Sequence, residues 1–149
     1  MSKIAACVIA LNSEGKIKDL LASLKDQMDY IVVGIDSKTD DATESVAQSF
    51  GAITYPFDFK DDFSAARDLS FYKVPEDTDW IMWIDTDEKL LNPEKVTKYL
   101  RPNCFNGYSI RQHHFACDTH FDADLPVRVF RNLKPGQPLR FGHKPMRFF

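Results

Sequence analysis

The feature that constrains the fold most is an unbroken apolar run near the start of the chain, residues 4–11. A short run of this kind is typical of a strand that is covered on both faces within a parallel sheet. Downstream, apolar side chains recur at helical spacing with charged residues between them, at Ile17, Leu20, Leu21 and Leu24. This pattern predicts an amphipathic helix that packs on the first strand.

The same alternation of strand and helix continues to residue 84. The expected elements are a strand at 30–35, a helix at 42–50, a strand at 52–55, a helix at 64–72 and a strand at 80–84. Gly51 stands where a left-handed residue ends a helix, and Asp62 or Ser64 is suited to cap the next one. Alternating strands and helices predict a mostly parallel, doubly wound α/β sheet with helices on both faces.

The character of the chain changes after Asn92-Pro93, which can cap and open a helix running to Leu100. Residues 107–115 and 126–131 have the β-branched and aromatic content of strands, and a turn at 135–138 precedes a further strand-like segment. A smaller mixed part therefore follows the α/β half. With 149 residues, we expect both to belong to one domain, 1–149.

Composition argues against several classes of protein. A net charge of -3 and a pI near 5.8 give no basic face for nucleic acid. The three cysteines are widely spaced and follow no signal peptide, which favours a reducing cytoplasm over a disulfide framework. No segment approaches the roughly 18 apolar residues of a membrane-spanning helix. We therefore expect a soluble, cytoplasmic protein.

Acidic residues follow three of the predicted strands, at 12–14, 36–41 and 85–88. Ligands of open α/β sheets bind beyond the carboxyl ends of the strands. Asp85 and Asp87, one residue apart, can direct oxygen ligands at Mg²⁺ or Mn²⁺, which would bridge to a pyrophosphate. Acidic pairs are also common at helix caps, and the 36–41 segment equally fits a solvated turn, so these motifs leave both interpretations open.

The motifs together resemble glycosyltransferase family 2. The resemblance is carried in order by residues 7–14, 31–43, 61–68 and 79–88. A weaker echo at 127–132 and 140–143 is similar to segments of bacterial members that build cell-surface glycans. The resemblance implies a GT-A, Rossmann-like fold. It also implies metal-dependent transfer of a sugar from a nucleoside diphosphate donor, with a UDP-sugar favoured, to the hydroxyl of a glycan or other acceptor, with inversion.

The resemblance also implies residue roles. The base would lie beside Leu11, Asn12 and Glu14, and Asp36 would contact the base or the ribose. The diphosphate would lie beside Asp62 and Arg67, since an arginine fork matches phosphate oxygens. Asp87 would bind the metal directly, and Asp85 would face the ribose or a water on the metal. Apart from the resemblance, His143 could join Asp87 as a metal ligand, although a histidine on a late loop is as often simply surface-exposed. For Arg67, a surface ion pair with a neighbouring aspartate is the alternative.

The chain departs from the family pattern in its second half. A lysine follows His143 where related members commonly have glutamate, Asp41-Ala42 replaces an expected aspartate-glycine step, and the chain is shorter than family members usually are. We therefore expect residues 1–91 to bind the nucleotide-sugar and 92–149 to be a shortened acceptor side. Asp122 and Asp124 are candidate bases by elimination, although both also suit a turn before Pro126.

Two alternatives to an active transferase remain. One is a catalytically silent or incomplete GT-A-like nucleotide-binding domain. The other is a structural zinc module, whose possible ligands are Cys104, His113, His114, Cys117 and His120. No C-x₂-C step supports the zinc module, and neighbouring histidines would point to opposite faces if 107–115 is a strand.

Overall fold

The computed structural model describes residues 2–100, 107–116, 119–121 and 124–132. Its elements in chain order are β1 (Ile4–Ala10), α1 (Glu14–Leu24), β2 (Tyr30–Asp36), α2 (Thr43–Ser49), β3 (Ile53–Phe57), α3 (Phe63–Tyr72), β4 (Trp80–Trp83), α4 (Pro93–Tyr99), β5 (Gly107–Ser109), β6 (His114–Ala116), β7 (Thr119–Phe121) and β8 (Val127–Arg131). The predicted alternation of strands and helices in the first part is confirmed. Boundaries differ from the predicted ones by one or two residues.

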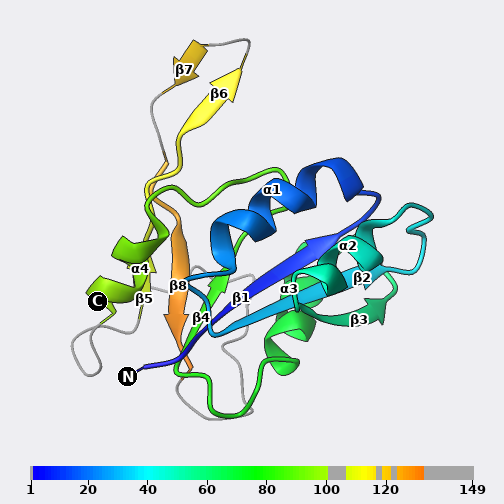
Figure 1. Cartoon of the computed structure of the whole chain (residues 1–149), viewed down its shortest axis with the longest axis horizontal. Helices are drawn as coiled ribbons and strands as arrows, with labels where there is room; N and C mark the ends of the chain where they lie inside the picture. The colour runs from blue at the N-terminus through cyan, green and yellow to red at the C-terminus, as the bar shows by residue number, and fades with distance from the viewer. Residues whose placement is uncertain (1, 101–106, 117–118, 122–123, 133–149) are drawn as a thin grey trace.

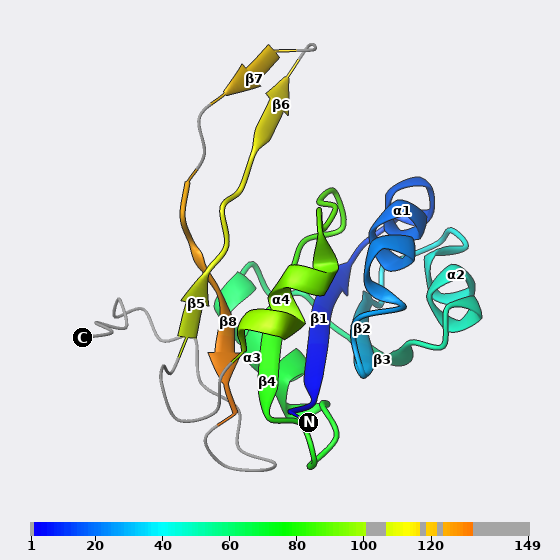
Figure 2. The same cartoon turned by 60° about the vertical axis from the view of Figure 1, so that its left-hand side comes forward.

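The main sheet has the strand order β3-β2-β1-β4-β8-β5. β1 runs parallel to both β2 and β4, and β2 runs parallel to β3. β8 lies antiparallel between β4 and β5, so the second half of the chain extends the same sheet. Strands β6 and β7 form a separate two-stranded hairpin, which projects away from the main sheet in Figures 1 and 2.

Helices cover both faces of the main sheet, as predicted. Alternate residues of β1 point to opposite faces. Ala6 and Val8 join a core with Leu20 and Leu21 of α1, and α2 and α4 pack on that same face. Cys7 belongs to a second core on the other face, where Phe71 of α3 packs. Figure 2 shows α1, α2 and α4 on one side of the sheet and α3 on the other.

Two local predictions about turns and caps are resolved. Gly51 follows α2 with φ +76°, a left-handed conformation that favours glycine, as predicted. Asp62, rather than Ser64, caps α3, because its carboxylate accepts the Ala65 N–H at 3.0 Å. Gly34 in β2 is required by packing, since a Cβ there would lie 2.5 Å from Tyr55 Oη.

The prediction of one continuous strand over 107–115 is wrong. β5 ends at Ser109, β6 begins at His114, and the two belong to different sheets. The register between β5 and β8 shifts at Tyr108/Ser109, a local irregularity that redirects the chain. β-branched and aromatic content alone cannot reveal such a break. The predicted turn at 135–138 and the segment after it lie outside the described residues.

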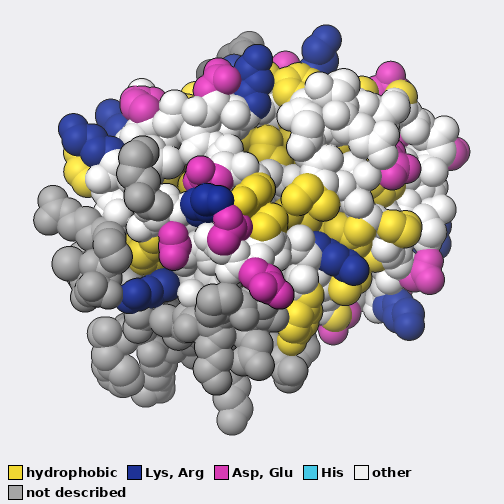
Figure 3. Space-filling view, turned by 60° about the horizontal axis from the view of Figure 1, so that its bottom comes forward, with side chains coloured by type: hydrophobic (Ala, Val, Ile, Leu, Met, Phe, Trp, Pro, Cys, Tyr) yellow, Lys and Arg dark blue, Asp and Glu magenta, His cyan; other side chains and the backbone are white. Residues whose placement is uncertain are grey.

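The described surface has no face of one charge sign in the view drawn, and the described helices are short. On the face drawn in Figure 3, the acidic and basic side chains of the described residues are interspersed rather than gathered by sign. The longest helix among the described segments is α1, with 11 residues, and none of the described helices is long and apolar enough to cross a bilayer.

Candidate functional site

The acidic strand ends predicted from the sequence do meet at one edge of the sheet. β2, β1 and β4 are parallel neighbours, so their carboxyl ends lie together. Consecutive β1 and β2 are adjacent, but β4 flanks β1 on the other side, which makes the β1–β4 boundary a switch point of the topology. Such a point is where open α/β sheets bind ligands. The candidate site therefore consists of the loops after β1, β2 and β4.

The loops after β1 and β2 are tied to each other by hydrogen bonds. Asn12, at φ 43°, accepts the Asp40 N–H through its Oδ1 at 2.9 Å. The Glu14 N–H donates to Asp41 Oδ2 at 3.0 Å, and Glu14 Oε2 accepts the Ala42 N–H at 3.3 Å. A hydrogen bond from the Thr43 hydroxyl, with further backbone donors, lowers the pKa of Asp41 and keeps it ionised. This side of the site is thus held in place by local polar contacts.

Leu11 and Asp36 present contrasting surroundings on this side of the site. Leu11 is 49% exposed at the end of β1, whereas Asp36 at the end of β2 is only 3% exposed. Asp36 Oδ1 accepts the Lys38 N–H at 2.8 Å, and its carbonyl accepts the Thr39 N–H at 2.9 Å. The structure thus has the turn that the residue pattern allowed. The role of Asp36 toward a base or ribose stays a prediction.

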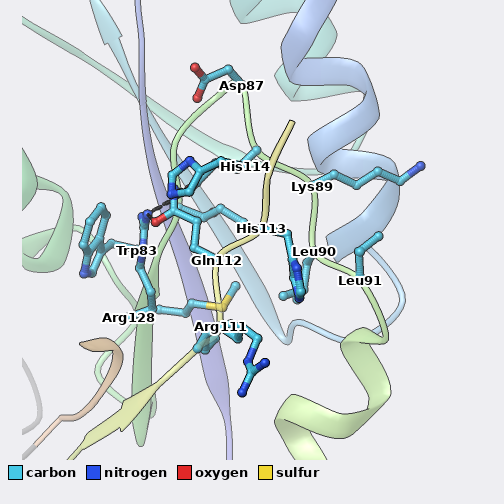
Figure 4. Close-up of a pocket in the computed structure, with 14 residues that line it drawn as sticks. Trp83, Asp87, Lys89, Leu90, Leu91, Arg111, Gln112, His113, His114 and Arg128 are labelled. Atoms are coloured by element: carbon cyan, nitrogen blue, oxygen red, sulfur yellow. Dashed lines mark hydrogen bonds and ion pairs between the residues drawn. The ribbon is translucent and has the colours of Figure 1, made fainter. Parts of the chain in front are cut away.

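The loop after β4 brings Arg67 and the acidic pair together. Arg67 Nη2 lies 3.2 Å from Asp85 Oδ1, and Arg128 Nη1 lies 3.9 Å from Asp85 Oδ2. The Asp87 carboxylate is exposed, and among the described residues none forms a hydrogen bond or ion pair with it. In Figure 4 it projects away from the side chains around Trp83. Asp87 therefore presents carboxylate oxygens that are available to a ligand.

Arg67 forms an ion pair with a nearby aspartate, which was the alternative to a phosphate-binding role. Its partner, Asp85, is itself a predicted site residue. The guanidinium also lies 4.3 Å from the centre of the Trp83 ring. Asp62, which precedes α3, caps the N-terminus of that helix. The contacts with Asp85 and Trp83 hold Arg67, and with it α3, at the edge of the site.

Four residues around this loop were not assigned roles from the sequence: Trp83, Glu88, Gln112 and Arg128. Arg128 Nη2 lies 2.7 Å from Glu88 Oε1, and its guanidinium lies 3.6 Å from the centre of the Trp83 ring. Both Trp83 and Glu88 flank the acidic pair, and Arg128 lies in the weaker echo. Sequence position gave no signal that they touch, since Arg128 follows Glu88 by 40 residues.

A pocket of about 530 Å³ opens beside the acidic loop (Figure 4). It lies between the end of β4, the loop after it, the segment that joins β5 to β6, and β8. The residues lining it are Met82, Trp83, Ile84, Asp87, Glu88, Lys89, Leu90, Leu91, Ile110, Arg111, Gln112, His113, His114 and Arg128. A pocket of this volume can take a sugar-sized ligand, and Asp87 is among the residues that line it.

Asp124 is connected to this pocket through His114. His114 Nε2 lies 3.8 Å from Asp124 Oδ2, with side-chain exposures of 45% and 87%. A pair this exposed contributes little to stability. The other candidate base, Asp122, and the candidate metal ligand His143 lie outside the described residues.

The predicted metal site has two carboxylates, those of Asp85 and Asp87, in the loop after β4. Among the described residues, no three or more histidine, cysteine, aspartate or glutamate side chains are grouped to hold a metal. Mg²⁺ and its analogues are often bound by only one or two carboxylates, with substrate phosphates and waters completing the shell. Asp85 and Asp87 fit that kind of shared site.

The zinc module gains no support from the part of the chain that is described. His113 precedes β6 rather than lying within a continuous strand, and both His113 and His114 line the pocket. The expectation that these two side chains point to opposite faces assumed one continuous strand over 107–115, which the structure does not have. Cys104 and Cys117 lie outside the described residues.

A sheet of this order, with helices on both faces and acidic loops at its switch point, is an α/β domain of the GT-A type. The family model for Glycosyl transferase family 2 matches residues 5–140. The chain therefore belongs to glycosyltransferase family 2.

Two relatives extend the comparison by sequence. A TPR repeat-containing protein of Synechococcus elongatus is 35% identical over 91 residues, covering 61% of this chain and 22% of its own length. The SPbeta prophage-derived glycosyltransferase SunS of Bacillus subtilis is 26% identical over 159 aligned positions, covering 97% of this chain and 37% of its own length. The chain thus spans well under half the length of either relative.

Solved structures share the fold. S. aureus TarS, residues 1–349, matches with a TM-score of 0.55 and 14% identity, covering 87% of this chain and 47% of those 349 residues. Glucosyl-3-phosphoglycerate synthase of Mycobacterium tuberculosis in complex with UDP matches with a TM-score of 0.54 and 21% identity, covering 64% and 38% of the two chains. Another structure of that synthase contains Mn²⁺, UDP and phosphoglyceric acid.

Proposed function

We propose that this chain transfers a sugar from a nucleoside diphosphate donor to an acceptor hydroxyl, with Mn²⁺ or Mg²⁺ bound at Asp85 and Asp87. The observation that carries the proposal is the position of Asp87. Its exposed carboxylate, which is unpaired among the described residues, lies at the switch point of the sheet, in the same loop as Asp85, which Arg67 contacts at 3.2 Å. Arg67 contacts Asp85 in the same loop as Asp87, and an arginine fork beside an acidic loop supports binding of a metal-bridged diphosphate.

On the donor side, each residue has a defined task. Asp87 would hold the metal, which when bound would supply positive charge to offset the charge on the departing diphosphate. Arg67 donates to diphosphate oxygens, exchanging part of its contact with Asp85 for the new one. Asp36 and the hydrogen-bonded loop around Asn12 and Glu14 lie toward the base and ribose, with exposed Leu11 against the base. The UDP-bound fold relative supports UDP as the first nucleotide to test.

On the acceptor side, the pocket beside Asp87 receives the hydroxyl-bearing molecule. Asp124 removes the hydroxyl proton as the oxygen attacks the anomeric carbon, and the bond to the diphosphate breaks in the same displacement, which inverts that carbon. The contact between Asp124 and His114, a pocket-lining residue, supports this choice. Asp122 remains a second candidate, and so does His143 as a metal ligand. We expect the reaction to take place in the cytoplasm.

A catalytically silent nucleotide-binding domain is the second candidate function. It is favoured by one observation, namely that the chain spans only 37% of SunS and 47% of TarS residues 1–349. A partner domain or the remainder of a longer protein would then supply the acceptor site. Both candidates predict metal-dependent nucleotide binding, and only the first predicts turnover.

Release of nucleoside diphosphate from a panel of nucleotide sugars, measured with Mn²⁺ and with a chelator, tests the proposal. Transfer to hydroxyl acceptors, or slow donor hydrolysis, is expected only with metal, and Asp87→Ala should abolish it. Metal-dependent binding without release on a broad panel would favour the silent domain. Absence of nucleotide binding under both conditions would contradict both candidate functions.

A further inference from the structure

The acidic loop after β4 is closed by its own last residue. The Asp85 N–H donates to Glu88 Oε2 at 2.8 Å, and the Glu88 N–H donates to the Asp85 carbonyl at 3.1 Å. These two hydrogen bonds join the first and last residues of the Asp85-Thr86-Asp87-Glu88 turn. The directions in which Asp85 and Asp87 project therefore depend on where the Glu88 carboxylate is held.

Residues from the second half of the chain hold that carboxylate. Arg128 of β8 donates to both of its oxygens, from Nη2 to Oε1 at 2.7 Å and from Nη1 to Oε2 at 3.1 Å. Gln112 adds a hydrogen bond from Nε2 to Oε1 at 2.8 Å and accepts one from Arg128 Nη2 at 2.9 Å. A two-pronged arginine contact fixes the orientation of a carboxylate as well as its position.

Arg128 itself has little freedom to move. Only 7% of the residue is exposed, and its guanidinium lies over the Trp83 ring at 3.6 Å from the centre. The next residue, Val129, is paired with Met82 in the antiparallel ladder of β4 and β8. Arg128 is thus attached to the strand that leads into the acidic loop, and it acts as a rigid anchor for that loop.

We propose that Glu88, Arg128 and Gln112 form a clamp that orients the acidic loop toward the metal and the donor diphosphate. This inference rests on the proposed function, because it takes Asp87 as the metal ligand. The clamp residues are positioning residues, acting through the loop that they hold. The donor site then depends on β8, and residues 1–91 alone do not complete it.

The first test uses Glu88→Gln, which keeps the size of the side chain and removes its charge. Groups that orient metal ligands typically contribute 10- to 100-fold to metal affinity. We expect the variant to bind Mn²⁺ in the presence of UDP about 10- to 100-fold more weakly, by calorimetric titration or by the EPR signal of free Mn²⁺. UDP affinity measured in a chelator should stay unchanged. A general structural defect would lower that affinity as well.

Arg128→Lys is the companion variant, because it keeps the positive charge and loses the two-pronged contact. It should weaken metal binding in the same direction. The matched control is Asp77→Asn, which makes the same carboxylate-to-amide change in an ion pair with Lys3 away from the acidic loop. The control should bind Mn²⁺ and UDP as the unmodified chain does.

Removing one partner of a buried ion pair leaves an unpaired buried charge, which can unfold a protein. A double variant that removes both charges avoids this problem. Glu88→Gln combined with Arg128→Gln removes both charges together, and circular dichroism verifies its fold. A folded double variant with unchanged Mn²⁺ affinity overturns the clamp, as do single variants that bind Mn²⁺ normally. If the unmodified chain itself binds no UDP in Mn²⁺, the proposed function fails instead.

Discussion

Asp87→Ala separates a ligand-binding role from a structural one most cleanly. Asp87 is exposed, and none of the described residues forms a hydrogen bond or ion pair with its carboxylate. Surface substitutions of this kind change the free energy of unfolding by no more than about 0.5 kcal/mol. Without ligand, the variant should therefore unfold within about 1–2 °C of the unmodified chain, given the usual 2–4 °C per kcal/mol for a domain of this size.

With ligand, the two proteins should differ clearly. UDP at 100 times its dissociation constant stabilises a native state by about 2.7 kcal/mol, which for a domain of this size raises the unfolding temperature by about 5–11 °C. We expect that rise for the unmodified chain in Mn²⁺, and for Asp87→Ala only the smaller rise seen in a chelator.

Thermal unfolding followed by circular dichroism measures both quantities. Asp26→Ala is a suitable control, because Asp26 is also exposed and follows α1, away from the acidic loop. The control should keep the full metal-dependent rise. The reasoning would be refuted if Asp87→Ala also kept it, or if the variant unfolded many degrees lower without any ligand.

Three further predictions concern catalysis, packing and reactivity. Asp124→Asn should lower the turnover number by about 10²- to 10⁴-fold while leaving UDP affinity nearly intact, because a base acts on the acceptor in the transition state; unchanged turnover would exclude it as the base. Gly34→Ala should destabilise the fold by about 1–3 kcal/mol in urea unfolding, because its Cβ would collide with Tyr55, and a neutral result would contradict the packing described. Burial raises the pKa of the Cys7 thiol to about 12, so the thiol should resist alkylation near pH 8 until the protein unfolds, and rapid labelling of the folded protein would contradict its burial.

The first half of the fold could be predicted because its signals are local. The apolar run that became β1 and the helical spacing of Ile17, Leu20 and Leu21 each identify an element without knowledge of the rest. Parallel strands then bring their carboxyl ends to one edge, so the neighbourhood of Asp36 and Asp85 followed from topology alone.

The second half resisted prediction because its organisation depends on contacts between distant residues. The break after Ser109 coincides with a register shift against β8, and local composition carries no trace of it. The contact of Glu88 with Arg128 joins residues 40 positions apart through antiparallel β4 and β8. Both residues lay in recognised motifs, but only the pairing of those strands gave them a shared role.

The central claim is that this chain binds a nucleoside diphosphate through a divalent metal at the end of β4. Calorimetric titration of UDP into the unmodified chain, once with Mn²⁺ and once with a chelator, tests it most directly. We expect at least about tenfold tighter binding with Mn²⁺, corresponding to about 1.4 kcal/mol. Equal affinity under the two conditions would contradict it.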